Sequence, residues 1–163
     1  MSTHVGTTSD SSGSVEEVFA VLTSTGWPAR KAAELHDGSA VVEREERPDG
    51  GVLLVVSREL PSSVPGFLER FLPADGRVVQ TDDWGPASGG ERHGTWSVAL
   101  PGAPATLGGT LRLAPTAAGS SYTISGEVTV KVPLIGGKAE RLIGEMVVKL
   151  AAKEADLLSR SLG

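Results

Sequence analysis

The sequence predicts an α+β fold in which a long C-terminal helix covers one face of a curved antiparallel sheet. Residues 133–162 repeat apolar side chains at helical spacing among charged ones, which describes one apolar stripe on a long helix. Residues 95–132 alternate apolar and polar side chains with a period of two, which is typical of strands with one buried face. Each pattern leaves an apolar surface exposed on its own, so we expect the helix and the sheet to cover one another.

The first thirteen residues leave two interpretations open. Residues 1–13 are rich in Ser, Thr and Gly, and they form either a flexible tail or a weak first strand over residues 3–9. Composition favours the tail, because such a segment has little apolar surface to bury.

Two short helices are predicted next. Ser14 is a typical N-cap, followed by acidic residues in the first turn and by the apolar face of a helix that ends near Gly26. A second helix begins at Trp27-Pro28 and ends over residues 36–38. Its inward side is expected to carry Ala29, Ala32, Ala33 and Leu35.

The middle of the chain predicts strands. Residues 41–47 and 52–60 flank a Pro-Asp-Gly-Gly turn and form a predicted hairpin, in which the alternating charges of the first strand indicate a solvated face rather than a binding patch. Residues 61–73 are bracketed by prolines and predict a short helical turn, and residues 77–84 predict another strand.

Three further strands precede the C-terminal helix, which gives about six to seven strands in one domain spanning residues 1–163. Their predicted inward face, which the helix should cover, consists of Trp96, Val98, Leu100, Leu107, Leu111, Leu113, Tyr122, Ile124, Val128, Val130 and Val132.

Composition excludes several classes of function. The net charge is −5, so the chain lacks the basic surface expected of a nucleic-acid-binding protein. Cysteine is absent, which excludes disulfides and zinc–cysteine sites. No apolar run has the length of a signal peptide core or a membrane span. We therefore expect a cytoplasmic monomer or homodimer with no nucleic-acid partner and no stable membrane insertion.

No motif predicts a metal, a cofactor or a catalytic residue. His93 lies two residues after Glu91, and this pair is better interpreted as a surface contact than as part of a metal site. Asp82 and Asp83 are neighbours in a predicted strand, so their side chains point to opposite faces. The Gly136-Gly137-Lys138 sequence lacks the remaining positions of a phosphate-binding loop and favours a close approach of the backbone to the sheet.

The order of elements resembles the helix-grip fold of the SRPBCC superfamily, which includes START and Bet v 1-like proteins. Within it the chain resembles the uncharacterised actinobacterial DUF2505 family, through Trp84-Gly85-Pro86-Ala87, Gly94-Thr95, Pro101-Gly102-Ala103-Pro104, Gly109-Thr110-Leu111 and residues 131–138. The resemblance implies an apolar cavity between the sheet and the long helix, of the kind that holds lipids, sterols or polyketides in that superfamily. It implies no particular ligand and no catalytic residues, and residues 3–9 depart from the strong first strand that it leads us to expect.

Three functions follow as hypotheses. The first is binding of a hydrophobic small molecule without catalysis. The second is a cyclase or dehydratase acting on a polyketide-like substrate, for which Tyr122, His93, Asp82 and Arg58 are the acid–base candidates and two titratable groups must reach one substrate atom. The third is a protein-interaction module with a filled interior. The predicted cavity lining comprises Trp27, Phe67, Phe71, Trp84, Trp96, Val98, Leu111, Tyr122, Ile124, Val128, Leu142, Met146 and Leu150.

Overall fold

The computed structural model describes residues 2–36, 40–59 and 76–162, without the side chains of residues 35 and 36. The predicted helical turn over residues 61–73, with Phe67 and Phe71, therefore lies outside the described residues, as does the predicted inward side chain of Leu35. None of the described helices is both long and apolar enough to cross a membrane.

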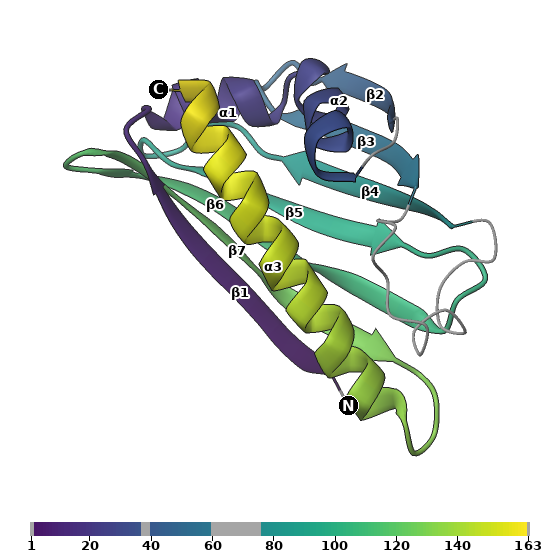
Figure 1. The fold of residues 1–163 in the computed structure, drawn as a ribbon. Coiled ribbons are helices and arrows are strands. Elements are labelled where there is room, and N and C mark those ends of the chain that lie inside the picture. The colour runs from purple at the N-terminus through teal and green to yellow at the C-terminus, as the bar shows by residue number, and fades with distance from the viewer. Residues whose placement is uncertain (1, 37–39, 60–75, 163) are drawn as a thin grey trace.

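Seven antiparallel strands form one curved sheet in the order β1-β7-β6-β5-β4-β3-β2 (Figure 1). The strands are β1 (Thr3–Ser11), β2 (Ala40–Glu46), β3 (Val52–Glu59), β4 (Arg77–Trp84), β5 (Arg92–Ala99), β6 (Ala105–Thr116) and β7 (Gly119–Val130). The predicted hairpin is β2–β3, and its turn is closed by Arg47 and Gly51, whose amide and carbonyl are 2.8 Å apart. The predicted α+β layout is confirmed.

Residues 3–11 form the first strand, so the prediction of a flexible tail was wrong. β1 pairs with β7 along its whole length, from Thr3 opposite Val128 to Ser11 opposite Ser120. Only Val5 is fully buried on this strand. The strand forms because β7 offers a row of backbone amides and carbonyls to pair with, and local composition does not encode that partner.

Two short helices follow β1. α1 (Val15–Leu22) begins at Ser14 with a complete capping box, in which Ser14 and Glu17 bond to each other's backbone amides. α2 (Gly26–Lys31) continues into a π-helical turn over residues 32–36. The predicted inward positions Ala29 and Ala33 are exposed, whereas Ala32 is buried.

The inward side of α2 is set by its first turn. Trp27 and Pro28 are buried there, and residues three to five positions later lie on the same face of a helix. That face includes Lys31 and Ala32, while Ala29 and Ala33 are rotated away from it.

A buried arginine fixes α1 to the sheet. Arg92, in β5, donates hydrogen bonds to the Glu16 carboxylate at 3.0 and 2.7 Å and to the Gly50 carbonyl at 3.0 Å. Its guanidinium also lies 3.9 Å from the centre of the Phe19 ring. Because these three groups surround one side chain, α1 is held against the end of the sheet, where its last residue, Leu22, reaches the interior.

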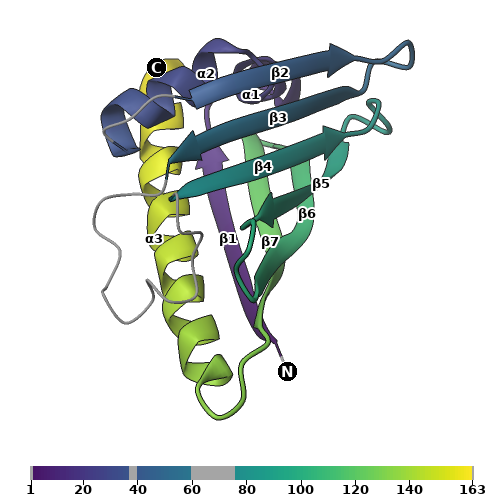
Figure 2. The same ribbon diagram turned by 90° about the vertical axis from the view of Figure 1, so that its right-hand side faces the viewer.

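The long helix α3 (Gly136–Leu162) crosses the concave face of the sheet and packs against β1 and β7 (Figures 1 and 2). Its C-terminal end lies beside α1 and its N-terminal end lies near the start of β1 (Figure 2). Gly136 permits the close approach predicted from the sequence, since a Cβ atom there would lie 2.6 Å from the Val130 carbonyl oxygen.

Glu140 does not belong to the charged solvent face predicted for α3. Its side chain is 2% exposed, and its carboxylate accepts hydrogen bonds from the Val130 amide at 2.9 Å and the Thr3 hydroxyl at 3.2 Å. A charged residue can be buried in this way because both oxygens have donors.

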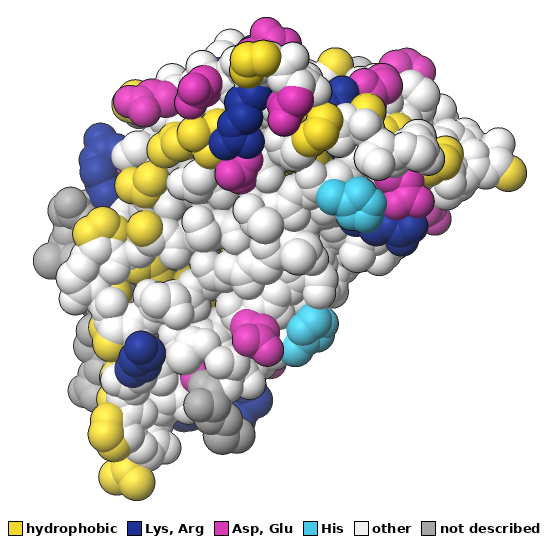
Figure 3. Space-filling view, turned by 180° about the vertical axis from the view of Figure 1, so that it is seen from behind, with side chains coloured by type: hydrophobic (Ala, Val, Ile, Leu, Met, Phe, Trp, Pro, Cys, Tyr) yellow, Lys and Arg dark blue, Asp and Glu magenta, His cyan; other side chains and the backbone are white. Residues whose placement is uncertain are grey.

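The outer face of the sheet is polar, as the alternation predicted. Figure 3 shows few apolar side chains over the middle of this face, where backbone and side chains that are neither charged nor apolar predominate. The opposite, inward face therefore holds the apolar side chains that α3 covers.

Candidate functional site

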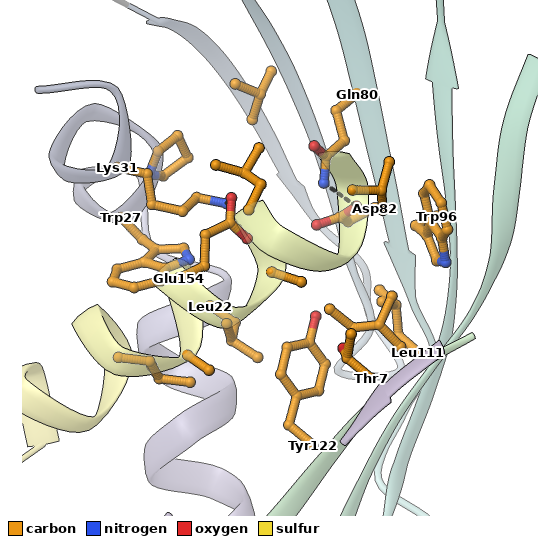
Figure 4. A pocket seen from close by; sticks show the side chains of 18 of the residues that line it. Thr7, Leu22, Trp27, Lys31, Gln80, Asp82, Trp96, Leu111, Tyr122 and Glu154 are labelled. Carbon is orange, nitrogen blue, oxygen red and sulfur yellow. Dashed lines mark hydrogen bonds and ion pairs between the residues drawn. The ribbon is translucent and has the colours of Figure 1, made fainter. Parts of the chain in front are cut away.

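A cavity of about 130 Å³ lies between the concave face of the sheet and the C-terminal half of α3. Every strand except β2 contributes to its wall, and α1 and α2 close one side. Figure 4 shows Leu22, Trp27 and Glu154 approaching it from helices and Asp82 and Trp96 approaching it from strands. The cavity exists because the sheet curves away from a straight helix.

Most of the lining is apolar. The strand side of the wall consists of Leu54, Val56, Trp96, Val98, Leu111 and Ile124. The helix side consists of Leu22, Trp27, Val147, Leu150, Ala151 and Leu158. The indole NH of Trp96 donates to the Ser125 carbonyl at 3.1 Å, which leaves that ring no polar group to present to the cavity.

Polar side chains lie on the same wall. Gln80 donates to one oxygen of the Asp82 carboxyl at 3.1 Å, and Lys31 and Glu154 form an ion pair at 3.6 Å. Arg58, from β3, also lines the cavity. These groups come from α2, β3, β4 and α3, so no local sequence motif unites them.

Tyr122 projects from β7 into the middle of the cavity (Figure 4). Its ring packs near Trp84, with the ring centres 6.2 Å apart. Burial, together with the charges of Asp82 and Glu154, raises the pKa of Tyr122 well above its ordinary value. The hydroxyl therefore keeps its proton at neutral pH and can donate a hydrogen bond to a bound molecule.

Burial also shifts the pKa values of two oppositely charged groups that line the cavity, Asp82 and Arg58. It raises the pKa of the Asp82 carboxyl, and Lys31 and Gln80 only partly oppose that effect. It lowers the pKa of the Arg58 guanidinium, although Glu154 and Asp82 attract its charge. Each shift has the direction expected when a charged form loses contact with water.

Two of these polar groups have no partner among the described residues. Among the described residues, neither the Tyr122 hydroxyl nor the Arg58 guanidinium is within hydrogen-bonding or ion-pairing distance of another side chain or backbone group. Buried polar groups in folded proteins are nearly always hydrogen-bonded. Both groups line a cavity, so a molecule inside it is positioned to supply the missing contacts.

The structure divides the predicted cavity residues into three groups. Those on the cavity wall are Trp27, Trp96, Val98, Leu111, Tyr122, Ile124 and Leu150. Those that lie in the surrounding core instead are Trp84, Val128, Leu142 and Met146. Phe67 and Phe71 lie outside the described residues.

The four core residues share the inward face with the cavity residues but occupy other parts of it. Trp84 is 1% exposed and packs edge-on against Phe19, with the ring centres 5.6 Å apart. Leu142 and Met146 lie in the N-terminal half of α3, whereas the cavity lies under its C-terminal half. Alternation identifies the face on which a side chain lies but not its position along that face.

Several lining residues were missed. Leu54, Val56 and Gln80 follow the period of two in β3 and β4, and that signal was sufficient to find them. Glu154 and Lys31 were not recognisable, because a charged residue on a helix is normally assigned to solvent.

The remaining acid–base candidate, His93, lies at the surface. His93 contacts Glu91 at 2.9 Å, and Glu91 also accepts two hydrogen bonds from Arg112 on the outer face of the sheet. Asp83 pairs with Arg47 on the face opposite Asp82. Within the described ranges, no group of three or more His, Asp or Glu side chains is arranged to hold a metal ion.

Comparisons with known proteins identify relatives over most of the chain. The sequence model of a family described as "Protein of unknown function (DUF2505)" matches residues 7–162. The uncharacterised protein Rv0481c of Mycobacterium tuberculosis is 32% identical over 153 residues, which cover 89% of this chain and 88% of that protein.

Two solved structures illustrate the fold. A START superfamily protein from Mycobacterium smegmatis matches 98% of this chain and 96% of its own, with a TM-score of 0.52 and 13% identity. The di-domain ARO/CYC protein StfQ of the steffimycin biosynthetic pathway matches 99% of this chain and 50% of its own, with a TM-score of 0.59 and 16% identity. At this identity the likeness concerns the fold, and it confirms the predicted helix-grip architecture.

Proposed function

This chain belongs to the DUF2505 family of START-like proteins of unknown function, and we propose that it binds a small, largely apolar molecule in the cavity beneath α3. The observation that carries this proposal is a cavity with apolar walls and with half-buried polar groups that have no partner among the described residues. Small-molecule sites typically combine these two features. A protein-interaction module was predicted to have a filled interior, so the cavity does not favour that hypothesis.

The volume limits the size of the guest. A cavity of about 130 Å³ is close to the roughly 150 Å³ that accommodates a benzene ring in an engineered protein core. The predicted lipid-like, sterol-like or polyketide-like ligand is therefore proposed here as a molecule or fragment of about one ring. The cytoplasmic location and the monomeric or dimeric state remain predictions.

The test uses single-ring probes and one matched pair of variants. Toluene, benzyl alcohol and benzoate are titrated into the full chain, and binding is followed by NMR shifts of the tryptophan indoles. Ala151→Leu adds three carbons on the cavity side of α3, and Ala152→Leu adds the same carbons at an exposed neighbouring position. We expect at least one probe to bind the wild type and Ala152→Leu with similar affinity, and Ala151→Leu to bind it at least tenfold more weakly.

Two results would contradict the proposal. If none of the probes perturbs Trp27 or Trp96, the cavity does not admit a guest. If Ala151→Leu and Ala152→Leu bind the probes equally well, the binding site lies elsewhere.

A second candidate function is catalysis in the same cavity. It is favoured by one observation: Asp82 and Tyr122 line the same space, and the charge of Asp82 contributes to the raised pKa of Tyr122. A carboxyl with a raised pKa and a protonated phenol on the same cavity wall can act as an acid–base pair.

Native mass spectrometry of protein purified from its own host distinguishes binding from catalysis. Binding predicts the same co-purified mass in the wild type and in Asp82→Asn, whereas catalysis predicts a different molecule in the variant.

A further inference from the structure

The polar groups of the cavity contain more donors than the protein itself satisfies. Glu154 is paired with Lys31 at 3.6 Å, and Asp82 accepts a hydrogen bond from Gln80 at 3.1 Å. The acids thus already have partners. The groups left over among the described residues are the Arg58 guanidinium, which can only donate, and the hydroxyls of Tyr122, Thr7 and Ser9, which can donate or accept.

Arg58 reaches the cavity because of the register of β3. Residues alternate between the two faces of a strand, and Val52, Leu54 and Val56 are buried on the inward face. Arg58 is the next residue of that series and lies opposite Val78, which is also buried. Its guanidinium, with five N–H donors, thereby belongs to a half-buried side chain that lines the cavity.

The protein does not neutralise this charge at close range. Within the described part of the chain, no carboxylate lies within 4 Å of the Arg58 guanidinium, although Glu154 and Asp82 attract it from farther away. A half-buried guanidinium without a close anion has lost part of its hydration, and a ligand that provides an anion would compensate for that loss.

We propose that the ligand is a small apolar carboxylic acid whose carboxylate pairs with Arg58 while its apolar body contacts the aromatic and aliphatic wall. This inference rests on the proposed binding function and specifies the chemical class of the ligand. A carboxylate matches the planar fork of a guanidinium and accepts two hydrogen bonds from it.

A ligand that carries an amine instead of a carboxylate fits the site less well. It would have to approach Glu154 or Asp82, and Lys31 already lies beside Glu154 and acts on Asp82. A second cation at that position would be repelled by Lys31 as well as by Arg58.

The test compares probes of nearly equal size that differ in one group. Benzoate, benzamide, benzylamine and toluene are titrated into the wild-type chain at neutral pH, with dissociation constants from NMR or calorimetry. We expect benzoate to bind about ten- to a hundredfold more tightly than benzamide, as a charge-assisted hydrogen bond predicts, and benzylamine to bind most weakly of the polar probes.

Variants then assign the preference to one side chain. Arg58→Met keeps the length and apolar character of the side chain but removes the charge, so it should abolish the preference for benzoate and change toluene binding by less than about threefold. Arg58→Lys keeps the charge without the fork and should retain part of the preference. Arg112→Met removes an arginine that is paired with Glu91 on the outer face, and it should bind all probes as the wild type does.

The outcomes separate this inference from the proposed function. If toluene binds but benzoate binds no more tightly than benzamide or benzylamine, the ligand class is wrong and the binding function stands. If the preference for benzoate persists in Arg58→Met, its assignment to Arg58 is wrong. If no probe binds, both proposals fail. The ranking of probes on the wild-type chain decides the ligand class even if the Arg58 variants do not fold.

Discussion

Asp82 and Asp83 show how a single step along a strand changes the chemistry of a residue. Asp83 faces outward and pairs with Arg47 near solvent, whereas Asp82 faces the cavity and has an amide, Gln80, as its close partner. Burial raises the pKa of Asp82. A carboxyl with a raised pKa in the folded state holds its proton to a higher pH than it does in the unfolded chain, so its ionisation subtracts from stability.

Removing that charge should stabilise the fold. Asp82→Asn keeps the shape of the side chain and an oxygen that accepts from Gln80. We expect its free energy of unfolding at pH 7 to exceed that of the wild type by about 1 kcal/mol or more, as expected when a partly desolvated charge is removed. The gain should shrink as the pH falls and vanish below about pH 4, the pKa of an unfolded aspartate, because the wild-type carboxyl is then protonated in both states. Urea unfolding between pH 3 and pH 8 measures the difference.

Asp83→Asn is the control for this prediction. It removes an exposed ion pair, so its free energy of unfolding should change by less than about 1 kcal/mol and should not increase. If Asp82→Asn is less stable than the wild type at pH 7, the Asp82 carboxylate has a structural partner rather than a role toward a ligand.

At the scale of elements, β6 and β7 approach each other closely where Trp96 crosses them. A Cβ atom on Gly126 would lie 2.3 Å from the Gly108 carbonyl oxygen and 2.7 Å from the Trp96 ring. The bare backbone of Gly126 is therefore the surface on which the indole rests, and it sets the depth of one cavity wall.

Gly126→Ala should disturb that wall. A methyl group there must displace either backbone or the indole, so we expect the free energy of unfolding to fall by about 2 kcal/mol and the Trp96 indole resonance to shift. Gly137→Ala provides the comparison, since an added Cβ would meet only the end of the Arg141 side chain, at 3.8 Å. That change lies in α3 and should raise the free energy of unfolding by up to about 1 kcal/mol. Equal stability of the two variants would mean that the close approach of β6 and β7 relaxes at little cost.

At the scale of the whole molecule, one buried carboxylate joins three elements, at the end opposite the small helices. Glu140 of α3 accepts from Val130 at the end of β7 and from Thr3 at the start of β1. The first strand, the last strand and the long helix thus meet at a single side chain. Their common point lies near the N-terminal end of α3, whereas the cavity lies under the C-terminal half of that helix.

Loss of this carboxylate should loosen β1 without removing it. Glu140→Leu leaves the Val130 amide and the Thr3 hydroxyl without partners, which should lower the free energy of unfolding by about 2–3 kcal/mol. Hydrogen exchange should accelerate most at Val130 and along β1. Glu140→Gln retains an acceptor, so its free energy of unfolding should fall by less than that of Glu140→Leu. Glu145→Gln, at an exposed position of the same helix, should change the free energy of unfolding by less than about 0.5 kcal/mol. Unchanged exchange in β1 would show that pairing with β7 alone holds the strand.

The same cases show how far the sequence determines the molecule. The capping box at Ser14, the alternation in β5 to β7 and the apolar stripe of α3 are local patterns, and each produced the predicted element because its physical cause lies within a few residues. The sequence alone therefore determined the α+β class, the order of elements and the face on which Trp96 and Tyr122 lie.

Only the tertiary structure decided the features that depend on distant partners. Thr3–Ser11 became a strand because β7 lies beside it, Glu140 was buried because two donors meet it, and Arg58, Asp82 and Glu154 came together from three separate elements. Backbone pairing and charge compensation act through space between segments, so composition near each residue carries no record of them. The position and the polarity of the cavity are consequences of how the helix crosses the bent sheet.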